Sequence, residues 1–212
     1  MSSALLVKNQ LRLNELRAPV LSGQSMSDGW RRTQLDLLWK LIEEHEQDIL
    51  NALKADLGKP GTEAMIEIIA LRQELKLANT KLQKWMSPIN VNIPFSLQPG
   101  QAEVRLEPLG CILIIGPWNY PFSLTIQPLI SALAAGNTAV LKPSENAPNT
   151  SNLIANLFKI YFPDNIVQVF EGDGEVAGEL LKYPFDHIFF TGGTAIGKKV
   201  LEAAAKNLTP VT

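Results

Sequence analysis

The stretch from Leu109 to Glu145 constrains the fold of this chain more than any other part of the sequence. It contains two short apolar runs, Cys111–Ile115 and Thr138–Leu141, and between them a segment of helical character, Ser123–Ala135. Continuous apolar runs are typical of strands buried on both faces, as in a parallel sheet. The order run, helix, run therefore predicts one β–α–β unit.

The same alternation continues along the rest of the chain. Strands are predicted at Ile166–Phe170 and His187–Phe190, and helices at Asn149–Tyr161, at Glu175–Leu181 and in a last segment that runs through Lys206. Four strands that alternate with helices are the pattern of a doubly wound α/β domain with a parallel sheet. We expect residues 109–212 to form this domain.

Residues 1–90 are predicted to be helical and to pack around the sheet. The expected helices are Ser2–Leu16, a second from the cap Ser27–Asp28 to about Gly58, and Thr62–Trp85. In the second helix, His45 is interpreted as a solvent-facing residue and not as a metal ligand, because no ligand partners accompany it. The apolar positions of the third helix are taken to be Ile66, Ile69, Leu75, Leu77 and Leu82.

Residues 91–108 have a different period. Ala102, Val104 and Leu106 alternate with charged residues, which predicts a half-exposed strand over 101–107. This strand is expected to pair with 91–97 across the turn at 98–100. The hairpin is either an arm that pairs with a dimer partner or a later part of the chain, or an ordinary edge hairpin.

Bulk composition excludes several classes of protein. With a net charge of −2 and no basic tract, nucleic acid is not expected as a partner. The single cysteine excludes an intrachain disulfide framework. No apolar stretch approaches ~20 residues and no signal-peptide pattern is present, so membrane association is not indicated and a cytoplasmic location is expected. Cys111 begins a buried strand and is interpreted as a core residue, not as a nucleophile.

Polar residues follow the two strands of the central unit directly. Lys142 and Glu145 come just after the second strand and flank Pro143. Ligands of open α/β sheets bind at this carboxyl edge, where Lys142 could donate to ribose hydroxyls and Glu145 could accept from them. A carboxylate at the 2′-hydroxyl favours NAD over NADP. The alternative is a solvated Lys–Glu pair on a loop.

The turn after the fourth predicted strand contains Gly192, Gly193 and Gly197. A strand, a glycine-rich turn and a helix start together favour a bound phosphate, since free N–H groups point out of the helix terminus. The spacing differs from GxGxxG because the middle glycine is adjacent to the first. Two glycines can also serve turn geometry alone, and this motif by itself leaves both readings open.

Asn119 lies in a turn with Trp118, Tyr120 and Pro121. Its amide could donate to an oxyanion. Asparagine also suits turns for local reasons, and spacing does not decide between the two.

The motifs together resemble the NAD(P)-dependent aldehyde dehydrogenase superfamily. They are Gly-Pro-Trp-Asn-Tyr-Pro at 116–121, Ala-Ala-Gly-Asn at 134–137, Lys-Pro-Ser-Glu at 142–145 and Phe-Thr-Gly-Gly-Thr at 190–194 through Gly197. Their order and spacing match, and the resemblance covers essentially the whole chain. The tail from Ala203 to Thr212 is most similar to the class 3, or fatty aldehyde dehydrogenase, branch.

The resemblance implies roles for individual residues. Asn119 would be the catalytic oxyanion-hole amide, and Lys142 and Glu145 would hold the adenosine ribose. It implies NAD as cofactor, with NADP tolerated, a homodimer, and no metal. The residues implied to bind the cofactor are Ile115, Pro117, Trp118, Lys142, Ser144, Glu145, Gly174, Gly178, Thr191, Gly192, Gly193, Thr194 and Gly197.

The chain departs from the family because it lacks the two residues that carry out the family's chemistry. The family uses a cysteine nucleophile and a glutamate base, which would lie beyond Thr212, and Cys111 matches neither position. We therefore expect the N-terminal half of an enzyme that oxidises a medium or long apolar aldehyde to a carboxylic acid, inactive on its own. The alternatives are a nucleotide-binding or assembly fragment, and a related acyl-phosphate or acyl-thioester reductase, which the Asn119 turn and the Lys142–Glu145 motif disfavour.

Overall fold

A parallel sheet of four strands lies at the centre of the computed structural model, which describes residues 3–212. The strand order is β5-β4-β3-β6, with every neighbouring pair parallel. All ten residues of β3 and β4 are buried, as the apolar runs predict. The strands are β3 (Cys111–Ile115), β4 (Thr138–Lys142), β5 (Val167–Val169) and β6 (His187–Phe190).

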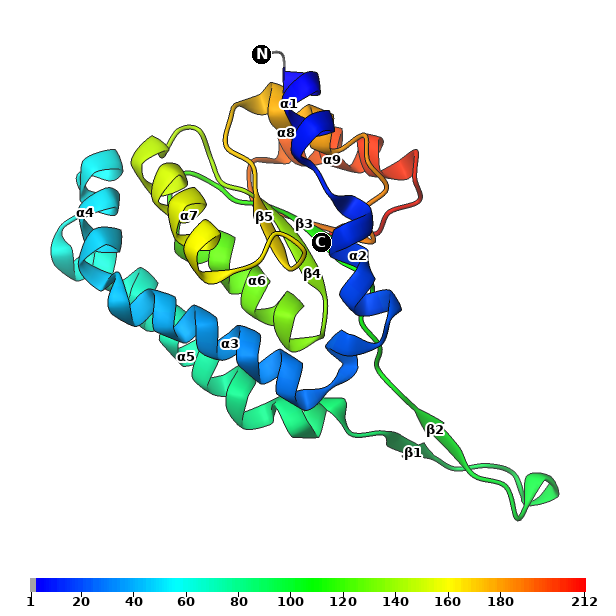
Figure 1. Cartoon of the computed structure of the whole chain (residues 1–212). Coiled ribbons are helices and arrows are strands. Elements are labelled where there is room, and N and C mark those ends of the chain that lie inside the picture. The colour runs from blue at the N-terminus through cyan, green and yellow to red at the C-terminus, as the bar shows by residue number, and fades with distance from the viewer. Residues whose placement is uncertain (1–2) are drawn as a thin grey trace.

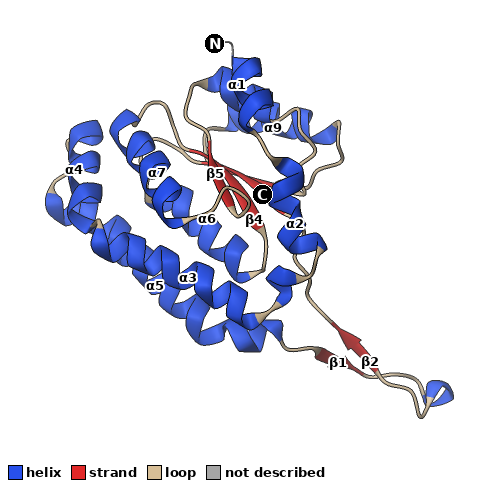
Figure 2. Cartoon of the chain, in the orientation of Figure 1, coloured by secondary structure: helices blue, strands red, loops and turns tan. Residues whose placement is uncertain are grey.

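Helices cover both faces of this sheet, so the prediction of a doubly wound α/β fold is confirmed (Figures 1 and 2). Ile112 and Ile114 face one core and Leu113 faces the other, because successive residues of a strand point to opposite sides. The first core contains α6 (Ser123–Ala134), α7 (Pro148–Tyr161), α3 (Asp28–Glu44), α4 (Glu46–Leu57) and α5 (Gly61–Met86); the second contains α1 (Ser3–Gln10), α2 (Leu13–Leu21), α8 (Gly174–Leu180) and α9 (Thr194–Ala205).

Two predicted helices are each divided in the structure. The first breaks after Gln10, so that α1 and α2 replace the single helix expected from Ser2, which itself lies outside the described residues. The second begins as predicted, with the Ser27 hydroxyl accepting from the Trp30 amide at 3.2 Å. It breaks at His45, and α4 then ends at Leu57, capped by Gly58, whose φ of +64° suits a glycine.

The interpretation of His45 as a solvent-facing residue is only partly correct. The side chain is half-buried; its Nδ1 lies 2.8 Å from Asp48 Oδ2 and its ring meets Tyr161 edge-on. His45 thus connects the break between α3 and α4 to α7. No group of three or more metal-ligating side chains exists among the described residues.

The apolar face predicted for the third helix is also largely wrong. Ile66, Ile69 and Leu77 are exposed, whereas Leu75 and Leu82 are buried. The buried face of α5 includes a charged residue, Glu67, which periodicity assigns to the solvent side. Its full set is Ala64, Glu67, Ile68, Leu71, Leu75, Ala78 and Leu82.

The hairpin forms and extends away from the body of the molecule (Figure 1). Its strands are shorter than predicted: β1 (Ile89–Val91) pairs antiparallel with β2 (Ala102–Val104). All six strand residues are exposed, so the expected half-buried face is absent from this part of the described chain. Pro94 precedes a short 3₁₀ turn at Phe95–Leu97, where a strand was expected.

The last residues of the chain extend the sheet. Val211 pairs in parallel with Ile188, and the Phe190 amide donates to the Thr212 carbonyl at 2.9 Å. Within residues 3–212, no helix combines the length and the apolar composition that crossing a bilayer requires.

Candidate cofactor site

The carboxyl ends of three adjacent strands lie level with one another. Ile115 of β3 is in register with Lys142 of β4 and with Phe190 of β6. The Gly116 amide donates to the Lys142 carbonyl at 3.1 Å, and the Thr191 amide donates to the Ile115 carbonyl at 3.1 Å. The three predicted ligand motifs therefore leave the sheet side by side, at the edge where α/β folds bind ligands.

Lys142 and Glu145 form an ion pair with a buried cation. Lys142 Nζ lies 2.7 Å from Glu145 Oε2, and the side chains are 2% and 42% exposed respectively. Lys142 is thus not part of a solvated surface pair. Beside them, Ser144 is buried and its hydroxyl accepts from the Asn146 amide.

The Glu145 carboxylate is held in its ionised form. Burial alone raises its pKa. The hydrogen bond from Lys142, a backbone hydrogen bond at Glu145 and the charge of Lys142 together outweigh burial, so the pKa lies below its ordinary value. The nearby Asp173 charge acts in the raising direction, which places the start of α8 close to Glu145. An exposed, ionised carboxylate at a strand end can accept hydrogen bonds from the hydroxyls of a ribose.

The glycine turn after β6 leads into the start of α9. Gly193 is the N-cap of this helix and offers no side-chain acceptor to the first N–H groups. A Cβ at Gly192 would lie 2.4 Å from the Phe190 ring, so a larger residue there would force the ring to shift. A Cβ at Gly193 would meet no atom within 4 Å, and at Gly197 it would make only ordinary contact with Phe190. The open space at Gly193 therefore fits close approach of a ligand phosphate.

Gly174 and Gly178 both lie on α8, beyond the end of β5. Both are exposed, and a Cβ at either would meet no atom within 4 Å. Asp173 caps this helix by accepting from the Glu175 amide at 2.9 Å. Glycine weakens a helix, so two glycines without a packing reason are compatible with a ligand near α8.

The turn between β3 and α6 presents Trp118 and Asn119 at the surface. Trp118 is 54% exposed and Pro117 is half-buried. Within the described chain, the Asn119 side chain has no hydrogen-bond partner, so it does not serve the turn through a local bond. Its amide is free to donate to a ligand atom.

This turn is nevertheless fixed from behind. Thr125 Oγ1 donates to the Pro121 carbonyl at 2.7 Å. A Cβ at Gly116 would lie 2.0 Å from Thr125 Oγ1, so only a glycine fits beside this hydroxyl. Two further residues, Lys59 and Glu67, contact the turn and were not identified from the sequence. No local pattern distinguishes them, because only the packing of α5 against α6 brings them there.

Cys111 and His187 lie at the opposite end of their strands, as predicted. The Cys111 thiol is buried, and burial raises its pKa to about 12, which confirms its interpretation as a core residue. His187 is partly buried, with Nε2 3.0 Å from Thr212 Oγ1.

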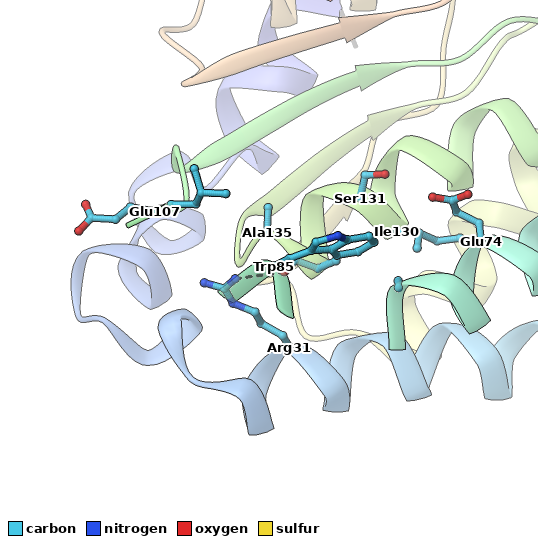
Figure 3. Close-up of a pocket in the computed structure, with 10 residues that line it drawn as sticks. Arg31, Glu74, Trp85, Glu107, Ile130, Ser131 and Ala135 are labelled. Carbon is cyan, nitrogen blue, oxygen red and sulfur yellow. Dashed lines mark hydrogen bonds between the residues drawn. The ribbon is translucent and has the colours of Figure 1, made fainter. Parts of the chain in front are cut away.

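Two of the hollows in the described chain bear on these residues. One, of about 300 Å³, is lined by Leu124 and Gln127 of α6 together with Phe189 and Thr191, so it adjoins the cofactor edge. The other, of about 290 Å³, lies at the base of the hairpin. Figure 3 shows the Trp85 indole in this second pocket, between Arg31 and Glu74.

The fold is a doubly wound α/β domain, and its carboxyl edge carries the candidate site. Comparison with known proteins identifies the family. The model of the aldehyde dehydrogenase family matches residues 22–212. The chain therefore belongs to the aldehyde dehydrogenase family.

Individual relatives agree with the class 3 resemblance. The chain is 44% identical over 206 residues to aldehyde dehydrogenase family 3 member A2 of Pongo abelii, which covers 96% of this chain and 42% of that protein. It is 43% identical to the "Aldehyde dehydrogenase, dimeric NADP-preferring" of Canis lupus familiaris, over 92% of this chain and 44% of that protein.

A solved structure matches the fold closely. It is that of Staphylococcus aureus AldH in a substrate-bound state, with a TM-score of 0.90 and 40% identity over 97% of this chain and 45% of that chain. The chain thus spans about two fifths of the length of these relatives.

Proposed function

We propose that this chain is the cofactor-binding part of an NAD(P)⁺-dependent aldehyde dehydrogenase that oxidises an apolar aldehyde of medium or long chain to its carboxylic acid. The observation that carries the proposal is the Lys142–Glu145 pair at the carboxyl end of β4. A buried ammonium holds an exposed carboxylate in its ionised form. The uncapped start of α9 leaves the sheet at the same carboxyl edge. These residues fit the adenosine ribose and the pyrophosphate of a dinucleotide.

The chain's own residues then have distinct tasks. Lys142 and Glu145 hold the ribose, and the N–H groups at the start of α9 face the phosphates. NAD(P)⁺, when bound, would serve as the hydride acceptor once a nucleophile has added to the aldehyde carbon. The Asn119 amide donates a hydrogen bond to the aldehyde oxygen as negative charge develops on it.

Cys111 supplies no nucleophile in this proposal. It lies buried at the opposite end of β3, and its raised pKa keeps the thiol protonated at neutral pH. We expect the 212-residue chain alone to bind cofactor without oxidising aldehydes. The alternative is an assembly fragment that folds and self-associates without binding a dinucleotide.

Calorimetric titration of the chain with NAD⁺ tests the proposal. Lys142→Met keeps the buried stem and removes the ammonium. The variant should bind about tenfold or more weakly, since hydrogen bonds to charged groups contribute roughly 1.5–3 kcal/mol. Lys182→Met, which removes the cation of an exposed pair with Glu179, is the matched control and should bind normally. Absence of binding by the wild-type chain, or equal binding by Lys142→Met, would refute the assignment.

We also propose a cytoplasmic homodimer formed through the hairpin. The support is the exposure of apolar residues along it, with Phe95 at 93% and Leu97 at 61%, and the Trp85 pocket at its base. One relative carries the word dimeric in its name.

A further inference from the structure

A buried ion pair lies directly behind the turn that carries Asn119. Lys59 follows the end of α4 and Glu67 lies on α5, and Lys59 Nζ is 2.7 Å from Glu67 Oε1. Their side chains are 6% and 0% exposed. Two charges removed from water are costly unless their remaining polar atoms are also satisfied. The partners of those atoms therefore show what the pair does.

The second oxygen of the carboxylate acts on α6. Glu67 Oε2 accepts from the Ser123 amide at 2.8 Å. Phe122, the N-cap of α6, has no side chain that could accept this bond. Glu67 thus supplies the missing cap from another helix, and its negative charge favours the N-terminal end of α6.

The ammonium acts on the other side of the same turn. Lys59 Nζ lies 3.8 Å from the centroid of the Tyr120 ring, in cation–π contact. Tyr120 directly follows Asn119 in the sequence, and Ser123 comes four residues after Asn119. The pair therefore holds Tyr120 and Ser123 together, while the Asn119 amide next to them remains unbonded and exposed.

General stabilisation of the fold does not explain this arrangement. A buried ion pair can often be replaced by apolar residues of similar volume without loss of stability. Such residues could neither accept a bond from the Ser123 amide nor attract the Tyr120 ring. Only the charged Lys59–Glu67 pair can make both contacts, and these contacts fix the position of the turn that carries Asn119.

We propose that Lys59 and Glu67 are positioning residues, which fix the Asn119 amide at the cofactor edge through Tyr120 and Ser123. The use of that amide toward a ligand rests on the proposed function. The fixing of the turn does not, and it can be measured in the free chain.

Hydrogen exchange of single amides tests the positioning directly. The Lys59→Met/Glu67→Leu variant replaces both charges with apolar side chains. The amides of Ser123 and Leu124 should exchange at least about tenfold faster than in the wild type. The control, Arg72→Met/Glu46→Leu, removes the ion pair between α5 and α4, which does not touch the turn, and should leave both amides unchanged. Unchanged exchange in the first variant would overturn the proposal.

Tyr120 provides a second test that leaves the buried charges in place. Tyr120→Phe keeps the aromatic ring, so the amides of Ser123 and Leu124 should exchange at the wild-type rate. Tyr120→Leu removes the ring, so the same amides should exchange faster. Equal exchange in these two variants would overturn the role of Lys59, even if the double variant did not fold.

Nucleotide titrations connect the turn to the proposed function. In Lys59→Met/Glu67→Leu, AMP should bind as in the wild type, because Lys142 and Glu145 are untouched. NAD⁺ should bind at least about threefold more weakly, because the turn would contact the nicotinamide half of NAD⁺, which AMP lacks. Undiminished NAD⁺ binding would overturn the link to the ligand. If the wild type bound neither nucleotide, the proposed function would fail, and the exchange measurements would still decide the positioning.

Discussion

Lys142 and Glu145 are three residues apart, yet one is almost completely buried and the other is open to solvent. The sheet explains this difference. Lys142 is the last residue of β4, in register with Ile115, while Glu145 lies beyond Pro143 on the outgoing turn. The buried ammonium has Glu145 as its carboxylate partner, so it keeps that group ionised and oriented.

Replacing Glu145 should change the preference between the two cofactors. A 2′-phosphate would meet the ionised Glu145 as a like charge, whereas a 2′-hydroxyl would not. In Glu145→Gln, the affinity for 2′,5′-ADP relative to AMP should therefore rise at least about fivefold, since two surface charges 4 Å apart interact by roughly 1–4 kcal/mol. Calorimetry with the two nucleotides measures the ratio. A ratio equal to that of the wild type would place Glu145 away from the 2′ position.

Cys111 should be chemically silent in the folded chain. Its thiol is buried and its pKa is raised to about 12 by burial, so almost no thiolate is present at pH 8. A disulfide reagent should label the chain only on the timescale of unfolding, and rapidly in urea. Because the chain has a single cysteine, the absorbance of the thiolate released by the reagent reports the labelling of Cys111 alone. Fast labelling under native conditions would contradict the core assignment.

At the scale of elements, α4 and α7 are joined by one carboxylate. Asp56 of α4 accepts bonds from the backbone and side chains of Asn149 and Thr150, in the first turn of α7, at 2.7–2.9 Å. Burial alone raises the pKa of Asp56, but these bonds outweigh it and bring the pKa below its ordinary value of 3.8. The start of α7 thus depends on a cap from another helix.

Asp56→Asn should destabilise the chain by about 1–2 kcal/mol at neutral pH, the usual contribution of a cap. A lowered folded-state pKa means that the stabilisation is complete above about pH 4 and is lost as the pH falls through that pKa. Urea unfolding at several pH values should therefore show wild type and variant converging below pH 3.8. Asp164→Asn, at an exposed aspartate after the end of α7, is the control. A difference that persisted at pH 2 would exclude the carboxylate as its source.

The elements differ in how well sequence alone predicts them. Cys111–Ile115 is predicted to the residue, because a strand buried on both faces reads as an unbroken apolar run. His187–Phe190 also has the predicted bounds, although it is only partly buried. The buried face of α5 is not, since Glu67 is buried by a tertiary ion pair and Ile66 is exposed. Periodicity assumes that charged residues face solvent, and here it cannot reveal a partner that lies in another segment.

Sequence alone likewise predicts one part of the candidate site and not the other. The Lys142–Glu145 pair and the Gly192–Gly193 turn follow strands directly, so their common edge is predictable from topology. The support behind Asn119 is not, because Lys59 and Glu67 reach it only after α5 packs on α6. Local motifs indicate where a ligand lies, but long-range packing determines how its contacts are held.

At the scale of the whole molecule, the hairpin is the part least supported by the rest. Its strands are exposed and pair only with each other in the described chain, and apolar side chains line its length. Exposed strand edges and apolar patches of this kind associate with other chains.

Phe95→Asp/Leu97→Asp should weaken self-association at least about tenfold, because the two side chains would lose their apolar burial on association. Sedimentation velocity over a range of concentrations measures this. Ile160→Asp alters an equally exposed apolar residue on α7 and should have no effect. A wild-type chain that stayed monomeric at high concentration, or a hairpin variant that dimerised normally, would contradict the proposed arm.

The most direct test of the central claim is an NMR chemical-shift map of the chain titrated with NAD⁺. The account predicts shifts at the carboxyl edge, at Trp118 and Asn119, at 142–145 and at 191–197, with Cys111 and His187 at the opposite edge unchanged. Shifts confined to that opposite edge, or none at saturating NAD⁺, would contradict a dinucleotide site at the strand ends.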